Sequence, residues 1–376
     1  MASQNIILVQ LYSNGDCLYA TTVAQQIKTD FPGCHLTWAI SSFCKSIIAN
    51  NPFVDEVMEV NTVAKNDIAA FRRLKRQIYR LQKKGVYDQV FIVHNADTNL
   101  AYYDGSIRSS ILKAYQHPIT VPVQPVLRLY PEEIERTRKF VIDSGLEKYN
   151  DVVLFEYAPQ SGQSNISLAF AMRIAEGIVA DQNVAVILSS ANKVNHSNKA
   201  IIDGSSLTLR ETAALSHYCT FLLGSSSGIT WITTSEAGKQ LPMVQLLNAH
   251  TTWVNPISRD FERFHIANNK VIELLSFDEP TIIACVKAAL KDFGSAKQKF
   301  NQHIPLHFRT TRSIIYNLLC YLEFGAILKH IEVNRVVYGD NVSFYKEVVL
   351  GFLLAPFTLV GNVFRKRLRR DGIRLL

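Results

Sequence analysis

Short apolar runs alternate with helical patterns along this chain, and the alternation limits the folds that are open to it. The first series begins with an apolar run over Asn5–Ser13, a helical pattern over Cys17–Phe31 and a second run over His35–Ile40. After a basic helical segment, an apolar run over Gln89–His94 follows. Strands that alternate with helices are typical of a parallel sheet covered by helices on both faces. We therefore expect an α/β domain of this kind in residues 1–150.

A second series of the same kind predicts a second α/β domain in residues 151–300. Its expected strands are Val152–Tyr157, Val184–Ser189, Thr220–Gly224 and Met243–Leu247, and its expected helices are Ser167–Val179, Thr208–Ser216 and Gly228–Ala237. With 376 residues, 48% of them hydrophobic, the chain can bury two cores of ordinary domain size. Ligands of doubly wound sheets bind beyond the carboxyl ends of the strands. We therefore expect a ligand site in a cleft between two facing domains.

Cysteine spacing and the start of the chain indicate the compartment. The six cysteines are scattered, with no paired spacing that suggests a disulfide framework or a metal cage: Cys17, Cys34, Cys44, Cys219, Cys285 and Cys320. No positive charge precedes the short apolar run near Met1, although a secretory signal would need one. No Asp-x-Asp metal motif is present. We therefore expect a cytoplasmic protein that uses no metal ion and no cofactor.

Residues 301–376 differ in character from both series and are expected to form a helical tail. The uncharged run Val348–Phe364 has 17 residues, fewer than the roughly 20 that cross a bilayer as a helix. Six basic residues and Asp371 give residues 365–376 a net charge of +5, out of +8 for the chain, and Phe71–Lys84 is a second basic cluster. Local basic patches favour an anionic surface on the inner face of the cytoplasmic membrane as a partner, and not a nucleic acid. A helix that packs back across the two domains is the alternative.

Two loops lie directly after a predicted strand and before a predicted helix. The first is Ser13-Asn14-Gly15-Asp16, and the second is Gly224-Ser225-Ser226-Ser227-Gly228. Backbone NH groups at the start of a helix attract negative charge, so the second loop is suited to a pyrophosphate. Each loop also has a plainer interpretation, in which Asp16 or a serine caps the helix that follows.

The sequence around both loops resembles the lipopolysaccharide heptosyltransferases of glycosyltransferase family nine. The segment LVQLYSNGDCLYATTVAQQIKTDFPGCHLTWAI, followed by NPFVDEVMEV, is similar to that family's strand, Ser-x-Gly-Asp turn, helix, tryptophan-bearing strand and Asn-Pro-x-Val-Asp segment. The segment SLTLRETAALSHYCTFLLGSSSGITWITTSEAGKQLPMVQL is similar to its donor-binding region, which ends in a Gly-Lys-x-Pro stop. The resemblance covers about residues 5–295.

The resemblance implies a GT-B fold, in which two Rossmann-like domains face each other across a cleft, and an inverting, metal-independent glycosyl transfer of hexosyl or heptosyl type. Asp16 matches the family's catalytic base, which takes a proton from the acceptor hydroxyl. The expected donor is a nucleotide diphosphate sugar. Its expected contacts are Ser13, Asn14, Gly15, Ser161, Gly162, Gln163, Ser189, Gly224, Ser225, Ser226, Ser227 and Gly228.

The expected acceptor is a glycolipid or a cell-surface glycan, as in the synthesis of lipopolysaccharide or a related polysaccharide. His94, Asn95 and Asp97 end a predicted strand and are expected to face the cleft, where they would touch this acceptor. A histidine at the end of a strand is also commonly structural.

Three positions depart from the family's pattern. Ser226 stands where the family usually has aspartate, Trp231 stands where it usually has histidine, and Ala158–Ser164 offers no basic residue to the donor phosphates. A nucleotide sugar other than ADP-heptose is one interpretation. A non-catalytic GT-B scaffold or nucleotide-sugar-binding protein is the alternative function, and a sugar-nucleotide epimerase is another. A dinucleotide enzyme is disfavoured because no strand is followed by Gly-x-Gly-x-x-Gly.

Overall fold

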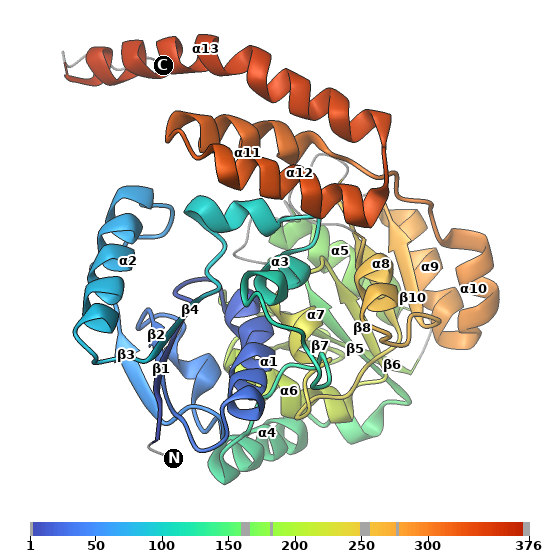
Figure 1. The fold of residues 1–376 in the computed structure, drawn as a ribbon. Coiled ribbons are helices and arrows are strands. Elements are labelled where there is room, and N and C mark those ends of the chain that lie inside the picture. Colours follow the sequence, from blue (N-terminus) through green and yellow to red (C-terminus); the bar gives the residue numbers. More distant parts are fainter. Residues whose placement is uncertain (1–2, 159–165, 181–182, 249–255, 276–277, 371–376) are drawn as a thin grey trace.

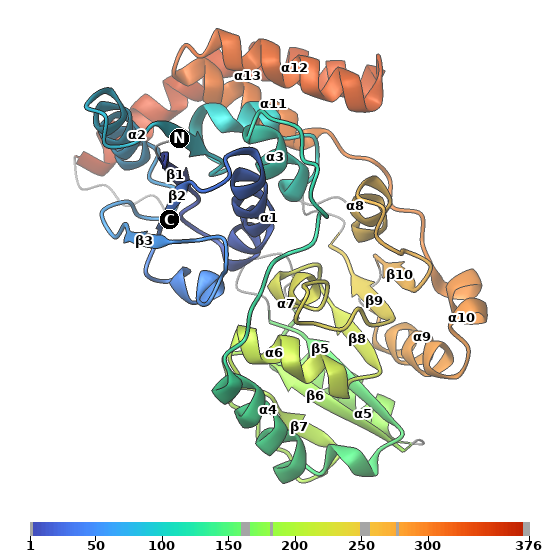
Figure 2. The ribbon, with the colours of Figure 1, turned by 60° about the horizontal axis from the view of Figure 1, so that its bottom comes forward.

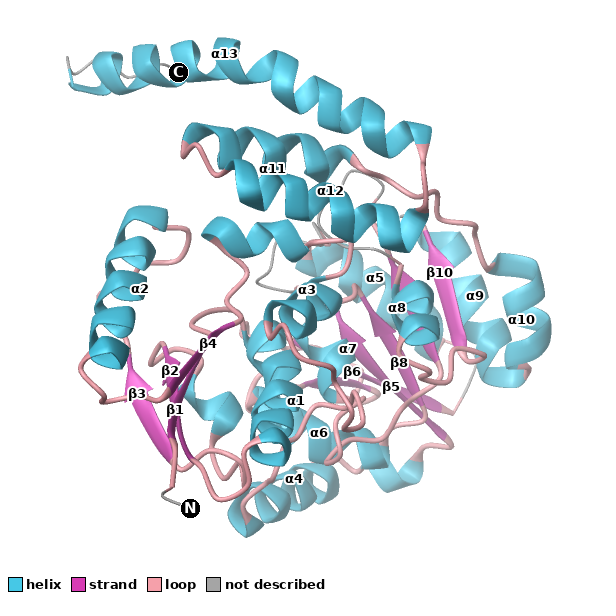
Figure 3. Ribbon diagram, viewed as in Figure 1, coloured by secondary structure: helices cyan, strands magenta, loops and turns pink. Residues whose placement is uncertain are grey.

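The structure is a computed structural model in which residues 3–158, 166–180, 183–248, 256–275 and 278–370 are described, with side chains as far as Pro356. Two parallel β-sheets form the centres of two α/β domains, and a layer of helices lies over the N-terminal domain (Figures 1 and 3). The two series of strands and helices in the sequence therefore correspond to two domains, as predicted.

The N-terminal sheet has four parallel strands in the order β3-β2-β1-β4. Its strands are β1 (Asn5–Val9), β2 (His35–Ile40), β3 (Glu56–Glu59) and β4 (Gln89–Ile92), and its helical segments are α1 (Asn14–Asp30), η1 (Lys45–Ile48), α2 (Ile68–Lys83), η2 (Asp97–Tyr102) and α3 (Ile107–Ala114). Ile6 and Leu8 of β1 pack with α1, whereas Ile7 and Val9 pack with α2. Both faces of β1 are therefore buried within the domain. The polar loop that follows this strand, Ser13–Asp16, lies at the carboxyl edge of the sheet.

The C-terminal sheet has six parallel strands in the order β10-β9-β8-β5-β6-β7. The strands are β5 (Asp151–Glu156), β6 (Val184–Ser189), β7 (Ile201–Asp203), β8 (Phe221–Gly224), β9 (Met243–Leu246) and β10 (Val271–Leu274). The helical segments are η3 (Leu146–Lys148), α5 (Leu168–Val179), α6 (Leu209–Leu215), η4 (Ser216–Tyr218), α7 (Gly228–Ile232), α8 (Ile257–Arg263), α9 (Glu279–Lys291) and α10 (Phe293–Phe300). The strand order reverses between β5 and β8. A crevice therefore forms beyond the carboxyl ends of these two strands.

A long connection joins the domains before α4 (Pro131–Asp143), and α4 packs against α6 of the C-terminal domain (Figure 2). Arg210 of α6 donates hydrogen bonds to both carboxylate oxygens of Glu133 on α4, at 2.7 and 2.8 Å. It also donates to the carbonyl oxygens of Ala49, at 2.9 Å, and Arg128, at 2.6 Å. This arginine thus holds together α6, α4 and the N-terminal domain. The division at residue 150 remains a prediction, and α4 precedes it in the sequence.

The tail is helical, as predicted, and consists of α11 (Arg309–Cys320), α12 (Phe324–Tyr338) and α13 (Val342–Arg370). It packs on the N-terminal domain through an apolar cluster that includes Tyr103, Ile315 and Phe344. Asn334 of α12 donates a hydrogen bond to the carbonyl oxygen of Tyr103 at 3.0 Å. Within the described ranges, no helix combines the length and the apolar character needed to span a membrane.

The helix predicted over Gly228–Ala237 is wrong beyond Ile232, where α7 ends. The hydroxyls of Thr233, Thr234 and Ser235 each donate a hydrogen bond to the carbonyl oxygen three residues earlier, at 2.8, 2.7 and 2.6 Å. Side chains of this kind compete with the helical pattern of backbone hydrogen bonds. The helix after the serine loop is therefore about one turn long, with a correspondingly small dipole.

Candidate functional site

A cleft of about 780 Å³ separates the facing loops of the two domains. Its lining comes from the carboxyl ends of strands in both sheets and from α3 and α8. Eight of the residues predicted from the sequence line it together: Ser13, Asn14, Gly15, Asp16, Ser189, Ser226, Ser227 and Gly228. Gly224 lies directly before this lining, at the end of β8, and Ser225 is buried beside it. The predicted donor residues Ser161, Gly162 and Gln163 lie outside the described residues.

Asp16 lies in the first turn of α1, after a sharp change of direction at Ser13, whose φ is 69°. A capping side chain accepts a hydrogen bond from a backbone NH group of the first turn. Within the described part of the chain, no hydrogen bond or ion pair is made by the carboxylate of Asp16, and Ser13 occupies the N-cap position. The interpretation of Asp16 as a helix cap therefore loses its geometric basis.

Burial raises the pKa of Asp16 to about 7, and the positive charge of Lys65 limits the rise. Asp16 is half-buried at the edge of the cleft, whereas Lys65 is exposed. At neutral pH the side chain is thus present both as an acid and as a carboxylate. This is the range in which a carboxylate is an effective general base.

The serine loop between β8 and α7 is joined to the neighbouring strand β9 by a hydrogen bond. Ser226 has a φ of 57°, and its backbone NH donates a hydrogen bond of 2.6 Å to Oε1 of Gln245 on β9. The hydroxyls of Ser225 and Ser226 are buried and have no hydrogen-bond partner in the described part of the structure. Buried hydroxyls are normally satisfied, so these two indicate a place where a polar ligand completes the loop.

The three predicted acceptor residues do not line the cleft. His94 is in contact with the ring of Phe71, at a centroid distance of 4.9 Å, and burial lowers its pKa to about 4. Asn95 accepts a hydrogen bond from Ser110 at 3.1 Å, and buried Asp97 pairs with Arg72 of α2. β4 ends at Ile92, and the backbone NH of His94 donates a hydrogen bond of 3.1 Å to the carbonyl oxygen of Val9 at the end of β1. Their contacts are those of structural residues.

Glu156, at the carboxyl end of β5, is a lining residue that we did not predict. Its side chain is buried, one of its oxygens has no hydrogen-bond partner, and burial raises its pKa to about 8 despite the backbone NH groups of Ile229 and Thr230. An acidic residue directly after the apolar run Val152–Phe155 was the available signal. At neutral pH this carboxyl is largely protonated and can donate a hydrogen bond to a ligand.

Arg108 of α3 is the second lining residue that we did not predict. Its guanidinium lies over the rings of Tyr19, Trp231 and Phe264, with its central carbon 4.7, 4.4 and 5.6 Å from the ring centroids. Asp260 of α8 is 3.5 Å from Nε of Arg108, too far for a good hydrogen bond. These residues come from both domains, and Arg108, Asp260 and Phe264 lie outside the two segments that resemble the family.

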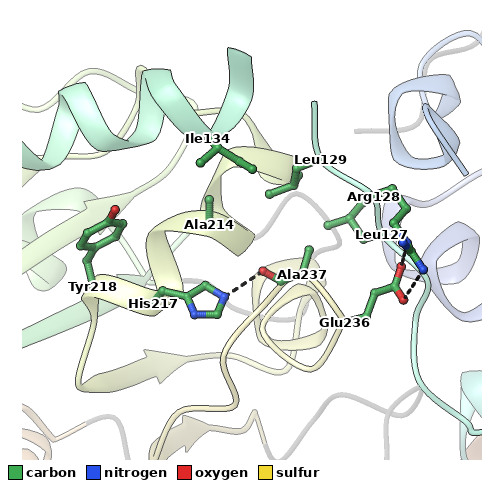
Figure 4. Close-up of a pocket in the computed structure, with 9 residues that line it drawn as sticks. All are labelled: Leu127, Arg128, Leu129, Ile134, Ala214, His217, Tyr218, Glu236 and Ala237. Carbon is green, nitrogen blue, oxygen red and sulfur yellow. Dashed lines mark hydrogen bonds and ion pairs between the residues drawn. The ribbon is translucent and has the colours of Figure 1, made fainter. Parts of the chain in front are cut away.

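A second cavity, of about 580 Å³, lies beside the long connection between the domains (Figure 4). Its charged groups are engaged with each other, since Arg128 and Glu236 form a salt bridge of 2.7 Å. His217 contacts the carbonyl oxygen of Ala237 at 3.1 Å. The groups that carry chemistry thus gather in the cleft between the domains, and we identify that cleft as the candidate active site. Clusters of His, Cys, Asp or Glu suited to a metal ion are absent from the described residues.

Two doubly wound domains whose loops face each other across a cleft define the GT-B class of fold, as the sequence predicted. No family model matches the chain. A Haemophilus influenzae protein described as "Putative glycosyltransferase" is 22% identical over 246 residues, which cover 53% of this chain and 70% of that protein.

Solved structures of similar fold include a family 9 glycosyltransferase from Veillonella parvula, with a TM-score of 0.53 and 14% identity over 79% of this chain and 98% of that one. ADP-heptose lipopolysaccharide heptosyltransferase II of E. coli has a TM-score of 0.51 and 13% identity, over 78% of this chain and 99% of that one. These comparisons confirm the predicted resemblance to glycosyltransferase family nine at the level of the fold.

Proposed function

We propose that this protein is an inverting glycosyltransferase that moves a sugar from a nucleotide diphosphate sugar to a hydroxyl of a glycolipid or glycan. The observation that carries the proposal is the position of Asp16, an unpaired carboxylate with a pKa of about 7, in the same cleft as the serine loop. The similarity to a protein described as a glycosyltransferase supports the class of reaction.

In the proposed reaction, the acceptor oxygen attacks the anomeric carbon of the donor sugar while its proton passes to Asp16. The bond between the anomeric carbon and the diphosphate oxygen breaks, and its electron pair stays on the diphosphate. Because attack and departure occur on opposite sides of the carbon, the configuration inverts. Asp16 lies on the N-terminal wall of the cleft and Ser226 on the C-terminal wall, so the two partners of the displacement would approach from different domains.

We propose that the transfer is independent of divalent metal and that the acceptor belongs to lipopolysaccharide or a related polysaccharide. The first part is supported by the unpartnered hydroxyls of the serine loop, which can donate to phosphate oxygens. Activity should then persist in a chelator. A loss of activity in EDTA that magnesium or manganese restores would contradict metal independence.

A screen of ADP-, UDP- and GDP-sugars against the full-length protein tests the central proposal. One donor class should raise the melting temperature, because a ligand that binds only the folded state stabilises it. That donor should then be consumed in the presence of a glycolipid acceptor. If a donor binds and is neither transferred nor hydrolysed, the protein is a nucleotide-sugar-binding scaffold. The departures from the family's pattern at Ser226 and Trp231 are the reason for considering this alternative.

We also propose that the tail attaches the protein to the inner face of the cytoplasmic membrane. Apolar side chains on α12 and α13 are exposed, among them Val336 at 80% and Val342 at 82%. The basic sequence of residues 365–370 follows on the same helix, α13. An amphipathic surface next to positive charge binds anionic lipid.

Removal of residues 357–376 tests the attachment. The cut follows Pro356 because Phe344 and Val348 are buried in the tail's apolar cluster, and a cut at residue 342 would uncover that cluster. Full-length protein should float with phosphatidylglycerol-containing vesicles, high salt should weaken the binding, and the truncated protein should stay in solution. Neutral phosphatidylcholine vesicles are the control. If the full-length protein ignores anionic vesicles, the tail is a structural brace.

A further inference from the structure

Unpartnered polar atoms gather at the cleft. Of the eleven buried side-chain nitrogen and oxygen atoms without a hydrogen-bond partner in the described structure, seven belong to residues that line the cleft. They are Oδ1 of Asn14, Nε, Nη1 and Nη2 of Arg108, Oε2 of Glu156, Oγ of Ser226 and Oδ2 of Asp260. Native proteins leave few buried polar atoms unpaired, so this concentration needs a chemical reason.

Arg108 accounts for three of these atoms. Its side chain is 2% exposed, and all of its guanidinium nitrogens are closed off from water without a hydrogen bond. The aromatic cage of Tyr19, Trp231 and Phe264 stabilises the charge but accepts no hydrogen bond in the plane of the guanidinium. Oδ2 of Asp260 lies 3.5 Å from Nε of Arg108 and has no hydrogen-bond partner of its own in the described structure, while Oδ1 accepts a hydrogen bond from Ser106. A buried arginine in this condition is costly unless an acceptor from outside the chain completes it.

The charges of the cleft show what kind of acceptor is missing. Three acidic residues line it, namely Asp16, Glu156 and Asp260, against Lys65 and Arg108 among the described lining residues. A nucleotide diphosphate sugar carries two negative charges, and Ala158–Ser164 supplies no basic residue. The single turn of α7 adds little dipole. Because Lys65 is exposed and screened, the buried cation that can balance the diphosphate is Arg108.

Arg108 is also in the right place for this task. Tyr19 follows Asp16 by three residues on α1, and Trp231 follows Gly228 by three residues on α7. Since residues three apart lie on the same side of a helix, the cage connects the turn with the catalytic carboxylate to the turn after the serine loop. The two rings touch edge to face, with centroids 5.3 Å apart, and Arg108 packs against both at this junction.

We propose that Arg108, a residue of the N-terminal domain, binds the diphosphate of the donor and stabilises it as it leaves; the inference rests on the proposed glycosyl transfer. On donor binding, the guanidinium gives up its contacts with the aromatic rings and instead donates two parallel hydrogen bonds to phosphate oxygens. When the sugar–oxygen bond breaks, the electron pair adds one negative charge to the diphosphate, and the same hydrogen bonds strengthen. Trp231, which stands in place of the family's usual histidine, forms part of the aromatic cage that surrounds Arg108 before the donor binds.

Calorimetry with inorganic pyrophosphate on the full-length protein in EDTA tests the assignment. Arg108→Met should weaken pyrophosphate binding by about ten- to a hundredfold, the range expected for lost hydrogen bonds between charged groups. The affinity of Arg108→Lys for pyrophosphate should lie between those of the wild type and Arg108→Met, because lysine keeps the positive charge but cannot donate two parallel hydrogen bonds. Arg128→Met is the matched control, since that arginine lies in the other cavity and pairs with Glu236.

Arg108→Met leaves Asp260 buried without its cation, so the double variant Arg108→Met/Asp260→Asn serves as a folding control, with a thermal melt of each protein. A folded variant without Arg108 that binds pyrophosphate as tightly as the wild type would overturn the proposal. The transfer reaction is judged separately. If Arg108→Met lowers pyrophosphate affinity and yet no nucleotide sugar is turned over by the wild type, the anion site stands and the glycosyltransferase proposal fails.

Discussion

Two buried arginines lie where the parts of this molecule meet, and they differ in how their hydrogen bonds are completed. Arg210 is 3% exposed and donates to both carboxylate oxygens of Glu133 and to the carbonyl oxygen of Ala49. Arg108 is 2% exposed and makes no hydrogen bond in the described structure, with Asp260 at 3.5 Å. Burial is the same in the two cases, but the number of acceptors is not.

The difference separates a structural charge from one that is available to a ligand. A guanidinium has five NH donors, and a fold that buries them must supply acceptors or accept a large cost. For Arg210 the chain itself supplies these acceptors, so the residue belongs to the framework. For Arg108 it supplies aromatic faces and one distant carboxylate. Burial alone is therefore a poor guide to function, whereas burial without hydrogen bonds is a useful one.

The largest effect should come from the framework arginine. Arg210→Met leaves Glu133 buried without a partner and should lower the free energy of unfolding by about 3–5 kcal/mol, the range for breaking a buried ion pair. Chemical denaturation measures this. The comparison requires that Arg108→Met/Asp260→Asn loses clearly less stability than Arg210→Met. Equal losses would mean that both arginines are structural.

A smaller but still large effect should follow from Asp16→Asn, in turnover instead of stability. Removal of the general base should lower turnover by about a hundredfold or more while donor affinity is kept. Steady-state kinetics with the acceptor identified in the screen is the measurement. Since the carboxylate of Asp16 has no partner in the described residues, the melting temperature at pH 5 should not fall. Near wild-type turnover in a folded variant would exclude Asp16 as the base.

The third prediction concerns the pH dependence of activity and stability, which follows from the raised pKa of Asp16. Its carboxylate form is the base, so kcat/KM should rise about tenfold per pH unit below pH 7 and level off above it. The same shift acts on stability with a definite sign. A carboxyl whose pKa rises from about 4 in the unfolded chain to about 7 in the fold makes the protein less stable as pH increases between these values. Asp16→Asn should remove the part of this loss that Asp16 causes, while the part caused by the raised pKa of Glu156 should remain, and denaturation curves at pH 5 and pH 8 would reveal the difference.

The smallest effect should come from Lys65, the exposed cation of the cleft. Its charge lowers the pKa of Asp16, so Lys65→Met should move the rise in kcat/KM to higher pH, by about half a unit or less because an exposed charge is screened. Pyrophosphate binding should change little. A tenfold loss of that binding would transfer the role of Arg108 to Lys65.

Elements with a strong pattern were predictable from the sequence. The strands expected at His35–Ile40 and Val184–Ser189 agree with β2 and β6 at both ends, because each is mostly apolar and lies within a buried parallel sheet. The three-residue edge strand Ile201–Asp203 was missed, since so short a segment has no period to detect. The sequence around Phe43–Asn50 has a helical pattern, but in the fold it forms only the 3-10 turn Lys45–Ile48.

The candidate site was predictable where its residues form local motifs, as around Asp16 and the serine loop. Arg108 lies 3.5 Å from Asp260, a residue more than a hundred positions away in the sequence, and only the folded chain brings the two together. The basic helix α2 illustrates the opposite error of interpretation. Arg72, which belongs to the basic cluster expected to face a membrane, pairs with Asp97 and with Glu323 of the tail. The net charge of a sequence segment therefore does not predict which partner its side chains face.

The raised pKa values of two cleft carboxyls, Asp16 and Glu156, also imply that donor binding and proton uptake are linked. A diphosphate that enters the cleft adds negative charge near Asp16 and Glu156, so both should bind protons more tightly and the complex should take up a fraction of a proton at neutral pH. The heat of binding would then depend on the ionisation enthalpy of the buffer. Because a bound donor raises the pKa of Asp16, less of this residue is in the carboxylate form that acts as the base. The pH at which kcat is half-maximal should therefore be higher than the pH at which kcat/KM is half-maximal.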